Sequence, residues 1–199
     1  MLAKEAQRKR RQAMRQAARQ LLLTEPYDAV TYTAIAEAAG FTRNSAPHIY
    51  SSKAELFAAL YRHEYDRWAT AFVAMVTDST QAPAAWLQDS LKHDGVLFRL
   101  APLLEPLVLA ELRVPVVASF RQYRFQLERK LSARLDDLRD KTVQGAGAQL
   151  ITHTLWTLSW IYQRRHGTAA EANAAAVARQ YELALRRVVA EITKIRPPR

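Results

Sequence analysis

Four consecutive residues of this chain, Thr42 to Ser45 with the sequence TRNS, bring together a guanidinium, an amide and two hydroxyl groups. Arg43 can form paired hydrogen bonds to guanine, Asn44 can form them to adenine, and the two hydroxyls can reach bases or phosphates. Gly40, one of only five glycines, stands just before them. Glycine adopts the left-handed backbone conformation that ends a helix at little cost. The spacing predicts a sharp turn that presents Thr42–Ser45, which we call the polar quartet.

Two short helices are expected on either side of this glycine. Thr31 is a good N-cap for a helix that runs to about Ala39, and Thr42 is the N-cap candidate for a second helix that runs to about His48. Helix, tight turn and helix are the parts of a helix-turn-helix, in which the first turn of the second helix meets base edges. The alternative is an ordinary helical corner with solvated caps.

A longer helix is expected upstream, over residues 4–23. Four residues recur at helical spacing on one apolar face, namely Met14, Ala17, Ala18 and Leu21. A different face carries a basic stripe at three- and four-residue steps, formed by Arg8, Arg11, Arg15 and Arg19. This stripe is either a solvated surface or the side of a helix that lies near a phosphate backbone.

The composition favours a helical protein with an anionic partner. The chain has 199 residues, 49% of them apolar, with few glycines and prolines, and its net charge is +10. Such a charge suits nucleic acid, a membrane surface or an acidic protein. The absence of cysteine excludes disulfides, thiolate nucleophiles and cysteine-based zinc sites. We expect no metal and no cofactor.

Neither catalysis nor a membrane is expected. The sequence has no phosphate-binding glycine loop, no HExxH and no nucleophile elbow, so the prediction is a protein that is not an enzyme and has no catalytic residues. The N-terminus lacks the apolar segment of a secretory signal. The apolar stretch over 149–163 is too short and too polar for a typical membrane span, so we expect a cytoplasmic protein.

The remainder of the chain has the pattern of a helical bundle. Helices are expected at about 53–77, 82–99, 115–139, 142–166 and 168–194, with a kink or break at Pro106. A capping box at Thr168–Glu171 opens the last one. We therefore expect an all-α protein with a helix-turn-helix DNA-binding domain over 1–53 and a larger helical domain over 54–199.

Aromatic residues in this bundle are candidates for lining a ligand pocket, although each of them also suits a packed core. The candidates are Trp68, Phe72, Trp86, Phe98, Phe120, Tyr123, His153 and Trp156. A ligand held there would be small and apolar or aromatic, because the long helices offer few uncompensated charges.

The stretch over 149–163 has apolar residues in nearly every direction around a helix. A helix that is apolar all round must be covered all round. The cover is either a second subunit or the rest of the same chain.

The segment TYTAIAEAAGFTRNSAPHIYSSKAELFAAL resembles the N-terminal signature of TetR-family transcriptional regulators, with similarity over about residues 8–60. The matching positions are Thr31, Ile35, Ala36, Ala39, Gly40, Phe41, Thr42, Ser52, Lys53 and Leu56. The resemblance implies three-helix heads that bind a palindromic operator in double-stranded DNA. It also implies a homodimer formed through the last two helices, and a small effector that usually releases the DNA.

The same resemblance assigns roles to residues near the turn. Thr31, Thr42, Tyr50 and Lys53 would contact phosphates, and Arg43, Asn44 and Ser45 would read bases. The sequence departs from the family pattern at Pro47 and Ile49, where phosphate-contacting residues are common. His48 is a candidate to replace one of these contacts.

The resulting functional prediction is an effector-responsive transcriptional repressor, with activation left open as the other mode of regulation. The competing hypothesis is a basic all-helical interaction module that binds acidic partners or a membrane surface without reading a DNA sequence.

Overall fold

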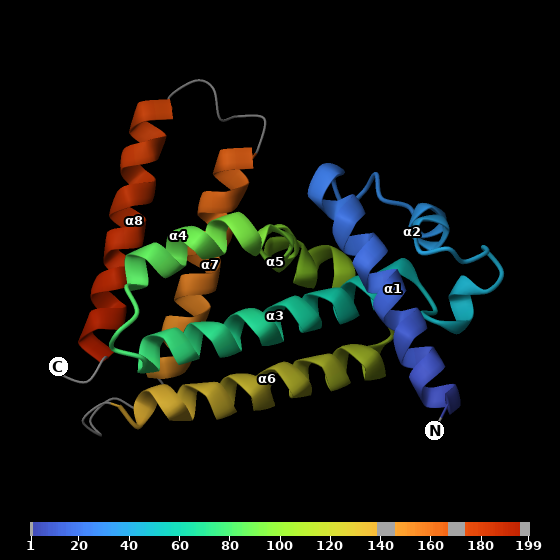
Figure 1. The fold of residues 1–199 in the computed structure, drawn as a ribbon, viewed down its shortest axis with the longest axis horizontal. Helices are drawn as coiled ribbons and strands as arrows, with labels where there is room; N and C mark the ends of the chain where they lie inside the picture. The colour runs from blue at the N-terminus through green and yellow to red at the C-terminus, as the bar shows by residue number, and fades with distance from the viewer. Residues whose placement is uncertain (1, 139–145, 167–173, 196–199) are drawn as a thin grey trace. The chain divides into compact units, whose positions relative to one another are not determined.

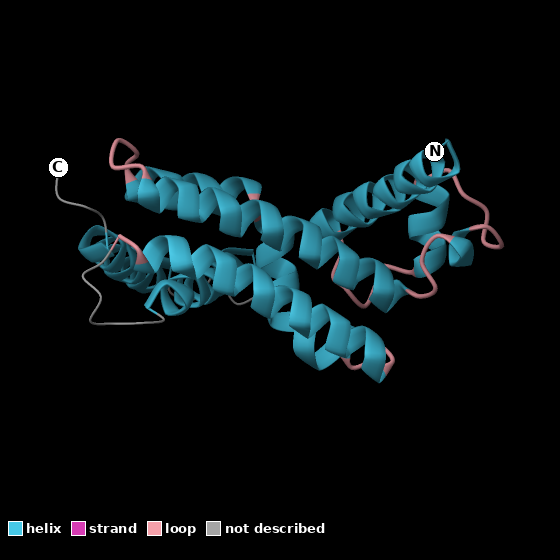
Figure 2. Cartoon of the chain, turned by 90° about the horizontal axis from the view of Figure 1, so that it is seen from below, coloured by secondary structure: helices cyan, strands magenta, loops and turns pink. Residues whose placement is uncertain are grey.

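All regular structure in the described residues is helical, as Figures 1 and 2 show, which confirms the predicted all-α class. The computed structural model describes residues 2–138, 146–166 and 174–195, and their side chains except those of residues 2, 3 and 174–177. The α-helices are α1 (Leu2–Thr24), α2 (Tyr32–Ala38), α3 (Lys53–Thr77), α4 (Pro83–His93), α5 (Gly95–Leu100), α6 (Val114–Asp136), α7 (Ala146–His166) and α8 (Ala174–Ile195). Shorter 3-10 helices span Ala46–His48 and Ala101–Leu103, and a π-helix spans Leu104–Leu109.

The chain forms two compact units. The first comprises Met1–His63 with Leu103–Phe120, and the second comprises Glu64–Pro102 with Arg121–Arg199. Both α3 and α6 therefore contribute residues to each unit. The domain boundary predicted between residues 53 and 54 remains a prediction, because this grouping does not show which part folds by itself.

In the first unit, α1 packs against α2. The apolar face predicted for α1 is buried at Met14, Ala17 and Ala18, while Leu21 is partly exposed and Leu22 is buried instead. The side chain of Thr31 accepts a hydrogen bond from the backbone N–H of Ala34 at 3.1 Å, which confirms the predicted N-cap of α2.

The turn after α2 depends on Gly40. This residue has φ +76°, and it is the one residue with positive φ in the described backbone. Its N–H bonds to the carbonyl of Glu37, and the N–H of Phe41 bonds to the carbonyl of Ala36. These two bonds form a Schellman motif, which satisfies carbonyls left free at the end of α2. The predicted glycine turn is confirmed.

In the second unit, α7 packs against both α5 and α8, and α4 packs against α8 (Figure 1). The single helix predicted over 82–99 is wrong, because the chain forms α4 and α5 with a break at Asp94. Asp94 has φ −102° and ψ 22°, and its carboxylate accepts hydrogen bonds from Arg67 and Ser90. The next residue is Gly95, where a larger residue would clash, because a Cβ there would lie 2.5 Å from the hydroxyl oxygen of Tyr162 on α7.

The described residues leave one face of α7 exposed, and Gln149, His153, Trp156 and Trp160 lie on it. The described part of the chain therefore does not supply the predicted all-round cover, and a second subunit as the cover stays a prediction. The capping box predicted at Thr168–Glu171 lies outside the described residues. The kink predicted at Pro106 takes the form of the π-helix Leu104–Leu109.

A substitution at Gly40 tests how much the turn depends on backbone conformation alone. A Cβ at this position would have no heavy atom within 4 Å, so its cost is strain and not a clash. We expect Gly40→Ala to lower the free energy of unfolding by about 1 kcal/mol and Gly40→Asn to lower it less, because asparagine tolerates positive φ better. Urea denaturation followed by circular dichroism measures both. Equal stability of the alanine and asparagine variants would contradict this account.

Candidate nucleic-acid interface

The polar quartet lies on a tight turn that its own side chains hold together. The carbonyl of Thr42 accepts hydrogen bonds from the N–H groups of Ser45 and Ala46, both at 3.1 Å. The hydroxyl of Thr42 accepts a further bond from the N–H of Ser45 at 3.2 Å, which closes the turn. The predicted N-cap role of Thr42 is wrong, because Ser45 is the N-cap of the 3-10 helix that follows. The Ser45 hydroxyl donates to the carbonyl of Thr42 at 3.0 Å.

The helix predicted over Thr42–His48 is not an α-helix, and this correction has a direct chemical cause. Residues 43–45 form a turn, and the 3-10 helix Ala46–His48 follows. The next α-helical bond would run from the N–H of residue 47 to the carbonyl of Arg43, but Pro47 has no N–H. The chain instead forms 3-10 bonds, from His48 to Ser45 and from Ile49 to Ala46.

The structure leaves the base-reading candidates accessible. Thr42, Arg43, Asn44 and His48 are exposed, and Ser45 is partly exposed. Ala46 and Ile49 are buried beneath them, with 0% and 3% of their surface exposed, so the segment is anchored from below. An arginine and an asparagine at the rim of such a turn can donate hydrogen bonds to the major-groove edges of bases.

Tyr50 occupies a different environment from the one expected for a phosphate contact. It is only 2% exposed, and its hydroxyl accepts a hydrogen bond from Arg15 Nη1 at 3.0 Å. The guanidinium carbon of Arg11 lies 5.2 Å from the centre of the same ring. The carbonyl of Tyr50 accepts a bond from the Tyr32 hydroxyl at 2.6 Å. Tyr50 therefore joins α1 and α2 to the end of the quartet segment and holds two arginines in place.

Lys53 is also engaged within the first unit. Its ammonium donates to the carbonyl of Tyr27 at 2.6 Å and lies 3.9 Å from the centre of the Tyr27 ring. Burial lowers the pKa of Lys53, an effect that Asp28 and Glu111 oppose. Burial raises the pKa of Tyr27 to about 12, and the carboxylates of Glu111 and Asp28 add to that shift. Lys53 thus ties the start of α3 to the α1–α2 connection.

Sequence reasoning missed the residues of α1 that border the quartet segment. Gln7 donates to the carbonyl of His48 at 3.2 Å, in addition to the contacts of Arg11 and Arg15 with Tyr50. The three- and four-residue spacing of the basic stripe was the available signal. It indicated one face of a helix, but it did not indicate that this face meets Tyr50.

A short α-helix, a glycine turn and a segment with exposed Arg43 and Asn44 correspond to the parts of a helix-turn-helix DNA-binding protein, with a turn and a 3-10 helix in place of the second α-helix. Comparison with known families agrees with this class. Residues 15–60 match the family described as bacterial regulatory proteins, tetR family. The chain carries the N-terminal DNA-binding domain of the TetR family, and it is a transcriptional regulator. This family consists of regulators without enzymatic activity, which confirms the prediction that the protein is not an enzyme. No curated protein sequence matches the chain.

Four of the predicted ligand residues form one aromatic cluster in the second unit. The rings of Trp68 and Phe72 stack with centres 5.4 Å apart, and the centres of Trp86 and Phe98 lie 6.4 and 6.5 Å from that of Trp68. Trp68, Phe72 and Phe98 are at most 1% exposed, and Trp86 is partly exposed. The cluster fills the core, so a ligand role for these residues stays a prediction.

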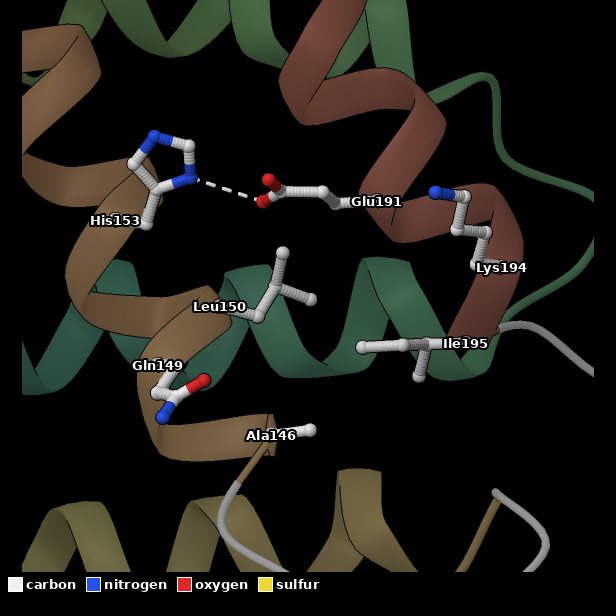
Figure 3. Close-up of a pocket in the computed structure, with 7 residues that line it drawn as sticks. All are labelled: Ala146, Gln149, Leu150, His153, Glu191, Lys194 and Ile195. Carbon is white, nitrogen blue, oxygen red and sulfur yellow. Dashed lines mark hydrogen bonds and ion pairs between the residues drawn. The ribbon is translucent and has the colours of Figure 1, made fainter. Parts of the chain in front are cut away.

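The other four candidates lie elsewhere. Phe120 belongs to the first unit, where its ring centre lies 6.1 Å from that of Tyr61, and Tyr123 belongs to the second unit. Trp156 is 49% exposed on α7. His153 Nδ1 lies 2.9 Å from Glu191 Oε2 on α8, at one side of a groove of about 320 Å³ (Figure 3).

A second groove, of about 520 Å³, lies between α4 and α8. Its walls include Ala84 and Gln88 of α4, Tyr181 and Leu185 of α8, and Arg165 of α7. None of the eight predicted ligand residues lines it. Within the described ranges there is no group of three or more histidine, aspartate or glutamate side chains that suits a metal ion. No helix in those ranges is long and apolar enough to cross a bilayer.

A buried polar network joins α3 to the break between α4 and α5. The Arg67 guanidinium lies 2.9 Å from Glu64 and 2.6 Å from Asp94, whose side chains are 3% and 8% exposed. Ser90 donates to Asp94 at 2.7 Å and accepts from the Trp68 indole at 3.0 Å. Burial disfavours the charge on Arg67, but the two carboxylates outweigh this and raise its pKa.

Removing Arg67 would take away the guanidinium that contacts both buried carboxylates, Glu64 and Asp94. Breaking a fully buried pair costs about 3–5 kcal/mol, and the half-exposed guanidinium reduces this here to about 2 kcal/mol. We expect Arg67→Met to lower the free energy of unfolding by about this amount, and so to lower the urea concentration at the midpoint of unfolding. Arg129→Met, at an exposed arginine of α6, is the matched control and should leave the midpoint unchanged. Equal midpoints for the two variants would show that the network does not stabilise the fold.

Proposed function

We propose that this regulator is an effector-responsive repressor that binds a palindromic operator as a dimer. The observation that carries the proposal is the exposure of Arg43 and Asn44 on an anchored turn whose flank is the basic face of α1. Base-reading donors and phosphate-binding cations are thus adjacent in one compact unit. DNA as the partner implies a cytoplasmic location in a bacterial cell.

The residues at this turn have separate roles in the proposal. Arg43, Asn44 and Ser45 read base edges, with Thr42 at the start of the turn. Thr31 and His48 are exposed and contact phosphates. Lys53 and Tyr50 act from the interior, since Lys53 holds the carbonyl of Tyr27 and Tyr50 positions Arg11 and Arg15. Phosphate contacts fix the register of the head on DNA, and base contacts supply the sequence preference.

The dimer forms through α7 and α8 in this proposal. Among the described side chains of these helices, three large apolar ones are exposed, with Trp156 at 49%, Trp160 at 40% and Leu183 at 53%. Tryptophan is the residue most often responsible for binding energy in protein interfaces, and exposed apolar patches mark association sites. A two-fold symmetric pair of heads then matches a palindromic operator.

The effector is a small apolar or aromatic compound bound in the second unit. The α4–α8 groove combines apolar walls with the Gln88 amide and the Arg165 guanidinium, a composition typical of ligand sites. The aromatic cluster around Trp68 is the other candidate location, and it would have to open to admit a ligand. A compound that binds as the effector would be identified in a screen because it releases the protein from the operator.

Selection of bound fragments from random duplex DNA tests the proposal directly. We expect a palindromic consensus, and we expect Arg43→Ala with Asn44→Ala to lose the preference for it at a cost of about 1–3 kcal/mol per base contact. Arg129→Ala with Gln126→Ala on α6 removes the same kinds of side chain from another exposed surface and should have no effect. Indifference to Arg43 and Asn44, with binding that depends on the stripe Arg8, Arg11, Arg15 and Arg19, would instead favour the nonspecific basic module.

Sedimentation equilibrium tests the dimer. Trp156→Glu places a charge in the proposed interface and should weaken association by about 2 kcal/mol or more. Phe125→Glu is the matched control, because Phe125 is 64% exposed on α6 and lies outside that interface. A dimer that withstands the Trp156 variant as well as the Phe125 variant would rule out α7 as the contact surface.

A further inference from the structure

The first three turns of α1 lie outside the part of the chain that the family comparison covers. The match begins at residue 15, whereas α1 begins at Leu2. Over the whole of α1 the sequence has seven Lys or Arg residues and a single acidic residue, Glu5. Five of these seven cations precede residue 15 and so lie outside the matched region, namely Lys4, Arg8, Lys9, Arg10 and Arg11.

Four of these cations share one face of the helix. At 100° per residue, Lys4, Arg8, Arg11 and Arg15 fall within an arc of about 60°, along a length of about 16 Å. Lys9 and Arg10 point about 130° away from the middle of that arc. Lys9 is also partly neutralised, because its ammonium lies 3.5 Å from Glu5. We call Lys4, Arg8, Arg11 and Arg15 the cationic arm.

The contacts of α1 show which side of the head this arm faces. Gln7, beside the arm on the helix surface, donates to the carbonyl of His48. Arg11 and Arg15 contact Tyr50, which lies two residues after His48. The arm therefore borders the end of the segment that carries the polar quartet, and α1 is held there by three side-chain contacts from separate turns of the helix.

The outer half of the arm is free to take an anionic partner. Lys4 and Arg8 are exposed, and neither has a hydrogen-bond or ion-pair partner among the described side chains. Duplex DNA carries one negative charge per about 1.7 Å of its axis. A row of cations about 16 Å long can therefore lie close to several phosphates at once. Lysine and arginine on an exposed face bind phosphates without reading a sequence.

We propose that the N-terminal half of α1 is a phosphate-binding arm that grips the DNA backbone beside the site contacted by the polar quartet. This inference rests on the proposed DNA-binding function and adds a second contact surface to it. The arm contributes affinity and salt dependence, and it contributes nothing to the choice of sequence. Its phosphates lie next to those reached by His48, because Gln7 fixes α1 at that residue.

Two matched double variants of the full-length protein test the arm. Lys4→Ala with Arg8→Ala removes two charges from the arm, and Lys9→Ala with Arg10→Ala removes two charges from other faces of the same turns. Both replace cations by alanine, the best helix former, so α1 keeps its helix in each case. Circular dichroism verifies that helix content is equal before any binding is measured.

The measured quantity is the slope of log K against log salt concentration, on the selected operator and on an arbitrary duplex of equal length. Each lost phosphate contact reduces the slope by about 0.9, so the arm variant should lose about 2 per bound head while the control loses little. The ratio of affinities for operator and arbitrary duplex should not change. In phosphate-ethylation interference, the arm variant should lose the signals of the wild-type protein only at phosphates that flank the bases contacted by the polar quartet.

The outcomes separate this inference from the proposed function. Equal losses of slope in the two double variants would overturn the arm and leave only a general effect of net charge. Unchanged slopes in both would overturn it as well. A wild-type protein that prefers no sequence would defeat the proposed repressor, yet the slopes on the arbitrary duplex would still decide whether the arm binds phosphates.

Discussion

The anchoring of Tyr50 is the interaction on which the rest of the DNA-binding unit depends. Its hydroxyl accepts a hydrogen bond from Arg15, and its carbonyl accepts one from the Tyr32 hydroxyl. The guanidinium of Arg11 lies over its ring. One buried residue thereby connects α1, α2 and the turn that carries the polar quartet. A short turn without a full helix cannot fix its own orientation, so the contacts of Tyr50 fix the orientation of the segment that carries Arg43 and Asn44.

The backbone of the quartet segment is set by Gly40 on one side and Pro47 on the other. Gly40 ends α2 with φ +76°, and Pro47 interrupts the α-helical bonding after a single turn. The result is a compact platform with Arg43 and Asn44 outward and Ala46 and Ile49 inward. A shorter platform offers fewer positions for reading bases, and in our proposal the flanking cations of α1 supply additional contacts to DNA.

In the second unit, buried polar groups lie at a helix boundary, and several large apolar side chains are exposed to solvent. Arg67, Glu64 and Asp94 pin α3 to the end of α4, where a helical sequence would otherwise continue. The exposed Trp156, Trp160 and Leu183 lie on the last two helices, away from that network in sequence. Buried charges thus lie at the helix boundaries inside the unit, and large apolar side chains lie exposed on the last two helices, where the proposed dimer would form.

The features that could be predicted from the sequence are those whose causes lie within a few neighbouring residues. Helical periodicity gave the all-α class, and the Thr31 cap, the Gly40 turn and the outward quartet follow from residues within a few positions of one another. The roles of Tyr50 and Lys53, the break at Asp94 and the exposure of Trp156 were decided by tertiary structure. Each depends on a partner 26 or more residues away, or on which side chains the other described helices cover. Spacing reveals which residues share a helix face, but burial and long-range hydrogen bonds exist only once the helices have packed.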